Sequence, residues 1–187
     1  MITLIILIKK AQKIEEYQIQ KYAHKIQRKN SLLVLKLENN KEYILKDSVK
    51  DDFALLYSFR EYYDSLNVFV IELQYYEGGA YLLVNGMNGE TQYVFGKTKL
   101  SPDMKKLVSY NADIVAGYSK NGFQIIDLKN FYFTIEYEYL PNDWGPNNIN
   151  WINNDEIEIE KLGLQNGTEK IIGKTKFILK DNWTEQK

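Results

Sequence analysis

The chain has 187 residues, of which 44% are hydrophobic and 14% aromatic, and its formal net charge is −1. This length and composition suffice for one substantial core, so we expect a single β-rich domain over residues 1–187. Because the chain has no cysteine, disulfides, thiolate nucleophiles and cysteine-ligated zinc are excluded.

The first 30 residues allow more than one interpretation. Residues 2–8 are apolar except for Thr3 but too few to span a bilayer, which needs about 20. They fit a buried strand of a cytoplasmic protein, or the remnant of a signal peptide of a periplasmic or secreted one. Further along, Ile14, Ile19, Tyr22 and Ile26 fit one face of a short helix, although an extended segment fits nearly as well.

Residues 32–37 and 42–46 predict a β-hairpin, because Asn39 and Asn40 between them are turn formers. Residues 51–63 have apolar side chains at spacings of three and four, which fit either an amphipathic helix or strands. The remainder is rich in Val, Ile and aromatic residues interrupted by Asn and Gly, which is typical of antiparallel strands. We expect strands over residues 66–76, 80–84, 91–95, 106–110, 114–118, 123–128, 131–140, 149–151, 157–162 and 171–179.

One phrase nearly recurs. Residues 100–108 read Leu-Ser-Pro-Asp-Met-Lys-Lys-Leu-Val and precede a Gly-containing strand that ends at Asp127, with a looser echo at 149–159. The phrase resembles the blade of a TolB-like or WD40-like β-propeller, except that Met104 replaces the usual turn glycine. The resemblance implies blade-like units at about residues 65–98, 99–140 and 144–187, and it favours strands over residues 51–63.

The predicted fold is therefore all-β and mainly antiparallel, with blade-like meanders forming a small or incomplete β-propeller. Closed propellers have about four to eight blades, and this chain reaches about four small ones. A partly rolled sheet or a sandwich of the same strands is the alternative. A short helix near the N-terminus is compatible with either.

Charge is unevenly distributed along the sequence. Residues 136–160 contain seven acidic side chains and no basic one, interleaved with aromatic residues. Acidic groups steer a basic protein toward a surface and aromatic rings anchor it there, whereas nucleic acid would be repelled. The simpler alternative is that the glutamates form the solvated face of one strand. The candidate partner-binding residues are Glu136, Tyr137, Glu138, Tyr139, Asp143, Trp144, Asp155, Glu156 and Glu158.

Trp144 stands before a Gly-Pro step, which favours a surface turn. Its ring is either an exposed recognition group or a cap folded back on the end of the core.

Motifs for catalysis are sparse. His24 is the only histidine, so a Ser-His-Asp triad would depend on it alone, and we interpret it as a surface residue. The sequence has no glycine-rich phosphate loop. We expect no catalytic residues, no metal and no cofactor.

The leading hypothesis is a bacterial immunity or inhibitor protein that neutralises a basic toxin. An exported structural or binding domain is the first alternative. A hydrolase that uses the carboxylates of Glu136 and Glu138 is the second.

Overall fold

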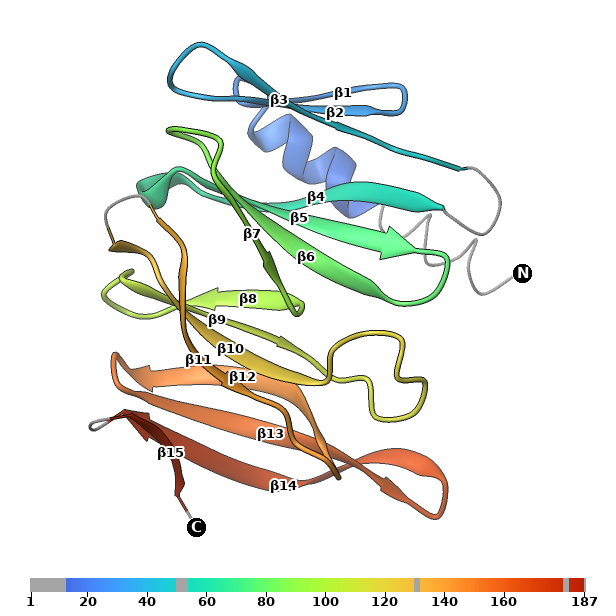
Figure 1. Ribbon diagram of the computed structural model, residues 1–187, viewed down its shortest axis with the longest axis vertical. Helices are drawn as coiled ribbons and strands as arrows, with labels where there is room; N and C mark the ends of the chain where they lie inside the picture. The colour runs from blue at the N-terminus through green and yellow to red at the C-terminus, as the bar shows by residue number, and fades with distance from the viewer. Residues whose placement is uncertain (1–12, 50–53, 130–131, 180–181, 187) are drawn as a thin grey trace. The chain divides into compact units, whose positions relative to one another are not determined.

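Figure 1 shows the computed structural model, which describes residues 13–49, 54–129, 132–179 and 182–186. The described strands form four antiparallel sheets, and none of these sheets closes into a barrel. The predicted all-β, antiparallel fold is confirmed, and the four sheets fit the alternative of a partly rolled sheet or a sandwich. Residues 2–8 and 51–53, for which strands were considered, lie outside the described residues.

The chain divides into two compact units, Met1–Tyr93 and Val94–Lys187. The expectation of one domain stays a prediction, and so does the resemblance to a propeller. No helix in the described ranges is long and apolar enough to cross a membrane.

In the first unit, residues 13–21 are helical, which settles the choice between helix and extended segment in favour of the helix. A three-stranded sheet follows, in the order β1-β2-β3, and then a sheet in the order β4-β5-β6-β7. The predicted hairpin over 32–37 and 42–46 is confirmed, as is the strand within 51–63. The strands are β1 (Ile26–Lys29), β2 (Leu32–Lys36), β3 (Glu42–Lys46), β4 (Leu55–Tyr63), β5 (Val68–Tyr75), β6 (Gly79–Asn85) and β7 (Thr91–Val94), with a 3-10 turn, η2 (Asp64–Leu66), after β4.

The core of this unit lies between its two sheets. Ile19 of the helix and Tyr22 in the turn after it pack against this core. The other two residues of the predicted helical face do not lie on that face, because Ile14 is 41% exposed and Ile26 belongs to β1. The buried members are Ile26, Leu33, Leu35, Leu37, Leu45, Phe59, Tyr62, Phe69, Ile71, Leu73, Leu82 and Val84.

The outer edge of β4 is covered by charged side chains. The backbone N–H of Tyr57 donates to Oδ1 of Asp47 at 2.9 Å, and that of Phe59 donates to Oε1 of Glu15 at 2.8 Å. Arg28 donates to the carbonyl of Tyr57 and also binds both carboxylates, at 2.6 Å and 3.1 Å. These contacts satisfy backbone groups that would otherwise be open to pairing with another chain.

The second unit consists of two four-stranded meanders, in the orders β8-β9-β10-β11 and β12-β13-β14-β15. Their bounds are β8 (Lys97–Leu100), β9 (Lys106–Asn111), β10 (Gly122–Asp127), β11 (Thr134–Tyr139), β12 (Gly145–Asn153), β13 (Glu156–Gln165), β14 (Thr168–Leu179) and β15 (Trp183–Gln186). The strand β15 was not predicted from the sequence.

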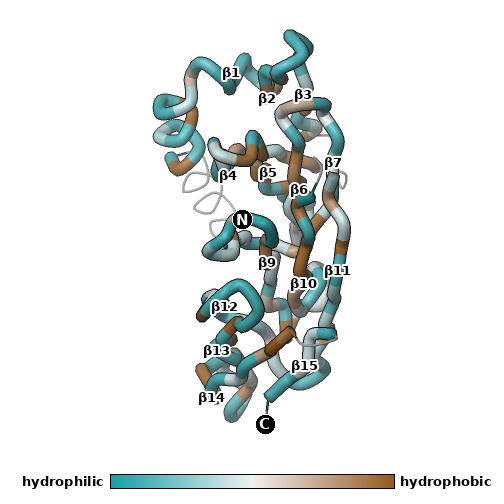
Figure 2. The backbone as a smooth tube through the Cα atoms, turned by 90° about the vertical axis from the view of Figure 1, so that its left-hand side faces the viewer, coloured by the Kyte–Doolittle hydropathy of each residue, from teal (hydrophilic) through white to brown (hydrophobic). Residues whose placement is uncertain are grey.

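The two meanders share one core. Phe123 of β10 and Phe177 of β14 meet edge to face with ring centroids 4.9 Å apart. Figure 2 shows the hydrophobic run along β10, of which all residues but Asp127 are buried. The buried members of this core are Val108, Tyr110, Phe123, Ile125, Trp144, Ile149, Ile157, Ile159, Phe177 and Trp183.

The turn between β8 and β9 explains the unusual residue in the Ser-Pro-Asp phrase. Met104 has φ of 58°, in the left-handed region that favours glycine. Its N–H donates to the carbonyl of Ser101 at 2.9 Å, and the Ser101 hydroxyl donates to Asp103 at 2.8 Å. The turn therefore keeps its conformation at the cost of one strained residue.

We expect Met104→Gly to raise the free energy of unfolding by about 1 kcal/mol, because a side chain in the left-handed region is disfavoured by roughly that amount. Met104 is 45% exposed, so little packing is lost. Met87→Gly is the matched control, since Met87 is 40% exposed and has no positive φ. Urea unfolding should show stabilisation by the first change only; a loss of stability in Met104→Gly would contradict the explanation.

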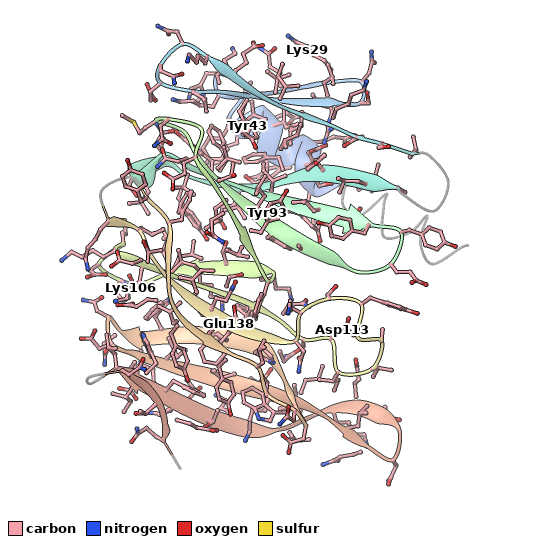
Figure 3. All side chains as sticks on the ribbon, viewed as in Figure 1. Lys29, Tyr43, Tyr93, Lys106, Asp113 and Glu138 are labelled. Carbon is pink, nitrogen blue, oxygen red and sulfur yellow. The ribbon has the colours of Figure 1, made fainter. Side chains whose placement is uncertain are left out.

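The predicted strand over residues 114–118 is wrong, because this segment belongs to a loop between β9 and β10. Asp113, labelled in Figure 3, lies at the base of that loop. Its carboxylate accepts hydrogen bonds from the backbone N–H groups of Ala116, Gly117 and Ser119 at 3.1, 2.9 and 2.8 Å. A strand would need those N–H groups for a neighbouring strand, so the local carboxylate decides the conformation.

Burial alone would raise the pKa of Asp113, but the hydrogen bonds from the backbone of Ser119, Gly117 and Ala116 outweigh it and hold the pKa below its ordinary value. Because its folded-state pKa is lowered, Asp113 stabilises the loop at any pH above the pKa that it has in the unfolded chain. This stabilisation is lost as the pH falls through the folded-state pKa. Amide hydrogen exchange should therefore show Gly117 and Ser119 protected at neutral pH and unprotected in strong acid. Asp113→Asn should expose both amides already at neutral pH; retained protection would contradict this role.

Candidate functional site

The structure divides the predicted acidic and aromatic set between two faces. On β11, Tyr137 and Tyr139 pack against the shared core, so Glu136 and Glu138 point to the other side of the sheet. On β13, Ile157 and Ile159 enter the core, so Glu156 and Glu158 point away from it as well. The two pairs of glutamates therefore lie on opposite outer faces of the packed sheets.

Lysines distant in sequence neutralise most of these glutamates. Lys106 of β9 pairs with Glu136, while Lys174 and Lys176 of β14 pair with Glu158 and Glu156 at 2.6 and 2.9 Å. Glu138, labelled in Figure 3, accepts a hydrogen bond from the Gln124 amide at 2.9 Å. For β13 the simpler interpretation, a solvated strand face, describes the structure. Asp155 lies exposed in the turn between β12 and β13.

Trp144 is not an exposed recognition residue. Its side chain is 6% exposed, and its ring lies 6.0 Å from that of Tyr139 and 5.4 Å from Nζ of Lys161. The Asn121 amide donates to its carbonyl at 2.9 Å. Trp144 thus takes the second of the two predicted roles, as a cap folded back on the core.

Two of the predicted residues, Tyr137 and Tyr139, share one face of β11, and Glu185 of β15 lies beside Tyr139. Asp143 follows β11 in the loop before β12. The Tyr139 hydroxyl lies 3.5 Å from Oε2 of Glu185, and Oε1 of Glu185 accepts a hydrogen bond from Thr175 at 2.8 Å. The negative charge of Asp143 acts on Tyr139, and that of Glu185 acts on Tyr137 and Tyr139. We call Tyr137, Tyr139, Asp143 and Glu185 the tyrosine–acid rim.

Sequence reasoning missed Glu185 because it lies outside the acidic stretch and in the unpredicted β15. The aromatic and β-branched pair Trp183-Thr184 was the available signal. Alternation gave none, because Trp183 is 2% exposed while Thr184 and Glu185 are both exposed.

The two tyrosines of the rim are held in place by aromatic packing. The Tyr139 ring lies 4.9 Å from Phe177 and 5.6 Å from Phe123, and the Tyr137 ring lies 5.9 Å from Phe123. Burial raises the pKa of both hydroxyls, and Glu185 adds to the effect for each. Both hydroxyls therefore stay protonated at neutral pH and can donate hydrogen bonds.

A pocket of about 320 Å³ opens in the first unit beside the β4 edge. Its lining includes Glu15, Glu16, Arg28 and Asp47. Glu15, Arg28 and Asp47 form hydrogen bonds with the backbone of β4, so their primary role is structural. Neither Glu136 nor Glu138 lines this pocket.

His24 is exposed. Within the described ranges, no three His, Cys, Asp or Glu side chains are grouped so as to hold a metal ion.

Comparison with protein-family models finds no match, and comparison with curated proteins finds no relative.

Replacing Glu185 should lower the pKa of Tyr139. Glu185→Gln removes the negative charge that opposes ionisation of the phenol, so the pKa should move down toward its ordinary value, while burial still keeps it raised. Titration of the tyrosine ring resonances by NMR would measure this change. Glu158→Gln on the outer face of β13 is the control and should leave Tyr139 unchanged; equal shifts in both variants would contradict the proximity of Glu185 and Tyr139.

Proposed function

We propose that this protein acts by binding another protein, with no chemistry of its own. More specifically, we propose a bacterial immunity or inhibitor protein that neutralises a basic toxin. The observation that carries the proposal is the tyrosine–acid rim, where two packed tyrosines border two carboxylates.

The tyrosines suit a protein interface because they are already immobilised. Tyr139 contacts Phe123, Phe177 and Trp144, so binding a partner would cost it little further conformational entropy. Tyrosine also offers an apolar ring and a hydrogen-bonding tip, a combination enriched in binding hot spots.

The carboxylates of the rim indicate the charge of the partner. Within the described part of the chain, neither Asp143 nor Glu185 forms an ion pair, whereas Glu136, Glu156 and Glu158 each do. A lysine or arginine of a basic partner could therefore bind Asp143 and Glu185 without displacing a cation of this protein. Basic clefts are typical of enzymes that cut nucleic acid, which supports a toxin of that kind as the target.

The proposal places the protein in the cytoplasm with its target. An exported binding domain is the alternative, and it would use the same rim on a basic partner at the cell surface.

The test is capture of the partner by the tagged protein from its native host, followed by affinity measurements on that partner. We expect a basic protein at one-to-one stoichiometry that is released by raised salt. Glu185→Gln should weaken binding about tenfold, equivalent to about 1.4 kcal/mol.

Glu158→Gln is the matched control, because the same change on the outer face of β13, away from the rim, should leave the affinity unaltered. An acidic partner, or equal affinities of the parent and Glu185→Gln, would overturn the assignment of the rim.

A further inference from the structure

Lys99 of β8 is a cation held by neutral groups. Its Nζ donates hydrogen bonds to Oδ1 of Asn150 at 2.7 Å and to Oδ1 of Asn148 at 2.8 Å, both from β12. Lys99 and Asn148 are half-buried, and Asn150 is exposed, so solvent reaches the group from one side. The ammonium therefore has a fixed position at an accessible place.

Further hydrogen bonds fix the residues around Lys99. The indole N–H of Trp151 donates to the backbone carbonyl of Lys99 at 3.0 Å. The hydroxyl of Tyr110, which is 4% exposed, donates to the same Oδ1 of Asn148 at 3.2 Å. With its oxygen facing Tyr110 and Lys99, the Asn148 amide has its NH₂ group left to donate elsewhere.

Lys99 forms no ion pair within the described part of the chain, although Glu160 and Glu158 lie opposite Asn148 and Asn150 in register on β13. Lys106, Lys174 and Lys176 each pair with a carboxylate, but no carboxylate pairs with Lys99. Burial, and then the positive charge of Lys97, lower the pKa of Lys99. Lys97 is two residues away on the same strand, so its side chain projects to the same face.

An ammonium has three N–H donors, and two of those of Lys99 are used by the asparagines. The third donor and the NH₂ groups of Asn148 and Asn150 have no hydrogen-bond partner within the described part of the chain. Donors and a positive charge gathered in this way are what an oxyanion requires.

We propose that Lys99, Asn148 and Asn150 form a binding site for an oxyanion, a carboxylate or phosphate group of a ligand, with Lys97 adding to the attraction. The site lies on β8 and β12, whereas the tyrosine–acid rim involves β11 and β15. The proposal therefore does not depend on the proposed function.

The test is an NMR titration of the full chain with sodium phosphate and, separately, with sodium acetate, against sodium chloride at matched ionic strength. The indole N–H of Trp151 is the reporter, because it donates to the backbone of Lys99. We expect a saturable shift of this resonance with at least one oxyanion and none with chloride. Saturation by phosphate alone identifies a phosphate site, and saturation by acetate alone identifies a carboxylate site.

Two variants separate binding at Lys99 from general salt effects. Lys99→Gln should abolish the saturable shift, while Lys105→Gln, which removes a largely exposed lysine, should retain it. Asn150→Asp keeps the ammonium in place but gives it an internal carboxylate, so it should also abolish the shift even if Lys99→Gln fails to fold. An equal response to chloride, no saturable response to either oxyanion, or persistence of the shift in Asn150→Asp would overturn the proposal.

Discussion

The contact between Phe123 and Phe177 underlies the arrangement of the second unit. The two rings belong to different four-stranded sheets, and their edge-to-face packing holds those sheets together at the centre of the shared core. The tyrosine–acid rim exists only because of this packing, since Tyr139 comes from one sheet and Glu185 from the other. A change that separated the sheets would therefore remove the candidate site along with part of the core.

Open sheets have edges, and this chain uses edge strands in two ways. The outer edge of β4 is covered by Glu15, Arg28 and Asp47, which occupy its backbone groups and so protect it from pairing with another chain. The edge strands β11 and β15 instead carry the tyrosine–acid rim. Charged side chains thus protect one edge, while polar side chains at two others are available to a partner.

Most of the strands could be predicted because period-two alternation and Asn-Gly turns are local properties of a sequence. The failures have identifiable causes. Residues 114–118 have strand composition, but Asp113 accepts hydrogen bonds from the backbone of Ala116 and Gly117 within them, and sequence composition does not reveal that competition. The turn at Met104 was recognisable from Ser-Pro-Asp, although the strain at this residue appears only in the backbone angle. Glu185 was missed because its neighbours in the site lie on a different sheet.

The charge of the candidate site shows why a sequence window misleads for a β protein. Residues 136–160 have no basic residue, yet strand pairing brings lysines of β9 and β14 to three of their glutamates. In β13 and β14 these ion pairs are diagonal: Glu158 lies opposite Lys176 in register but binds Lys174. The opposite charges of such a pair largely cancel in the electrostatic field that a partner protein encounters. For the proposed recognition, the groups to weigh are those that the sheets leave without an ion pair, such as Glu185 and Lys99, rather than the density of acidic residues along the chain.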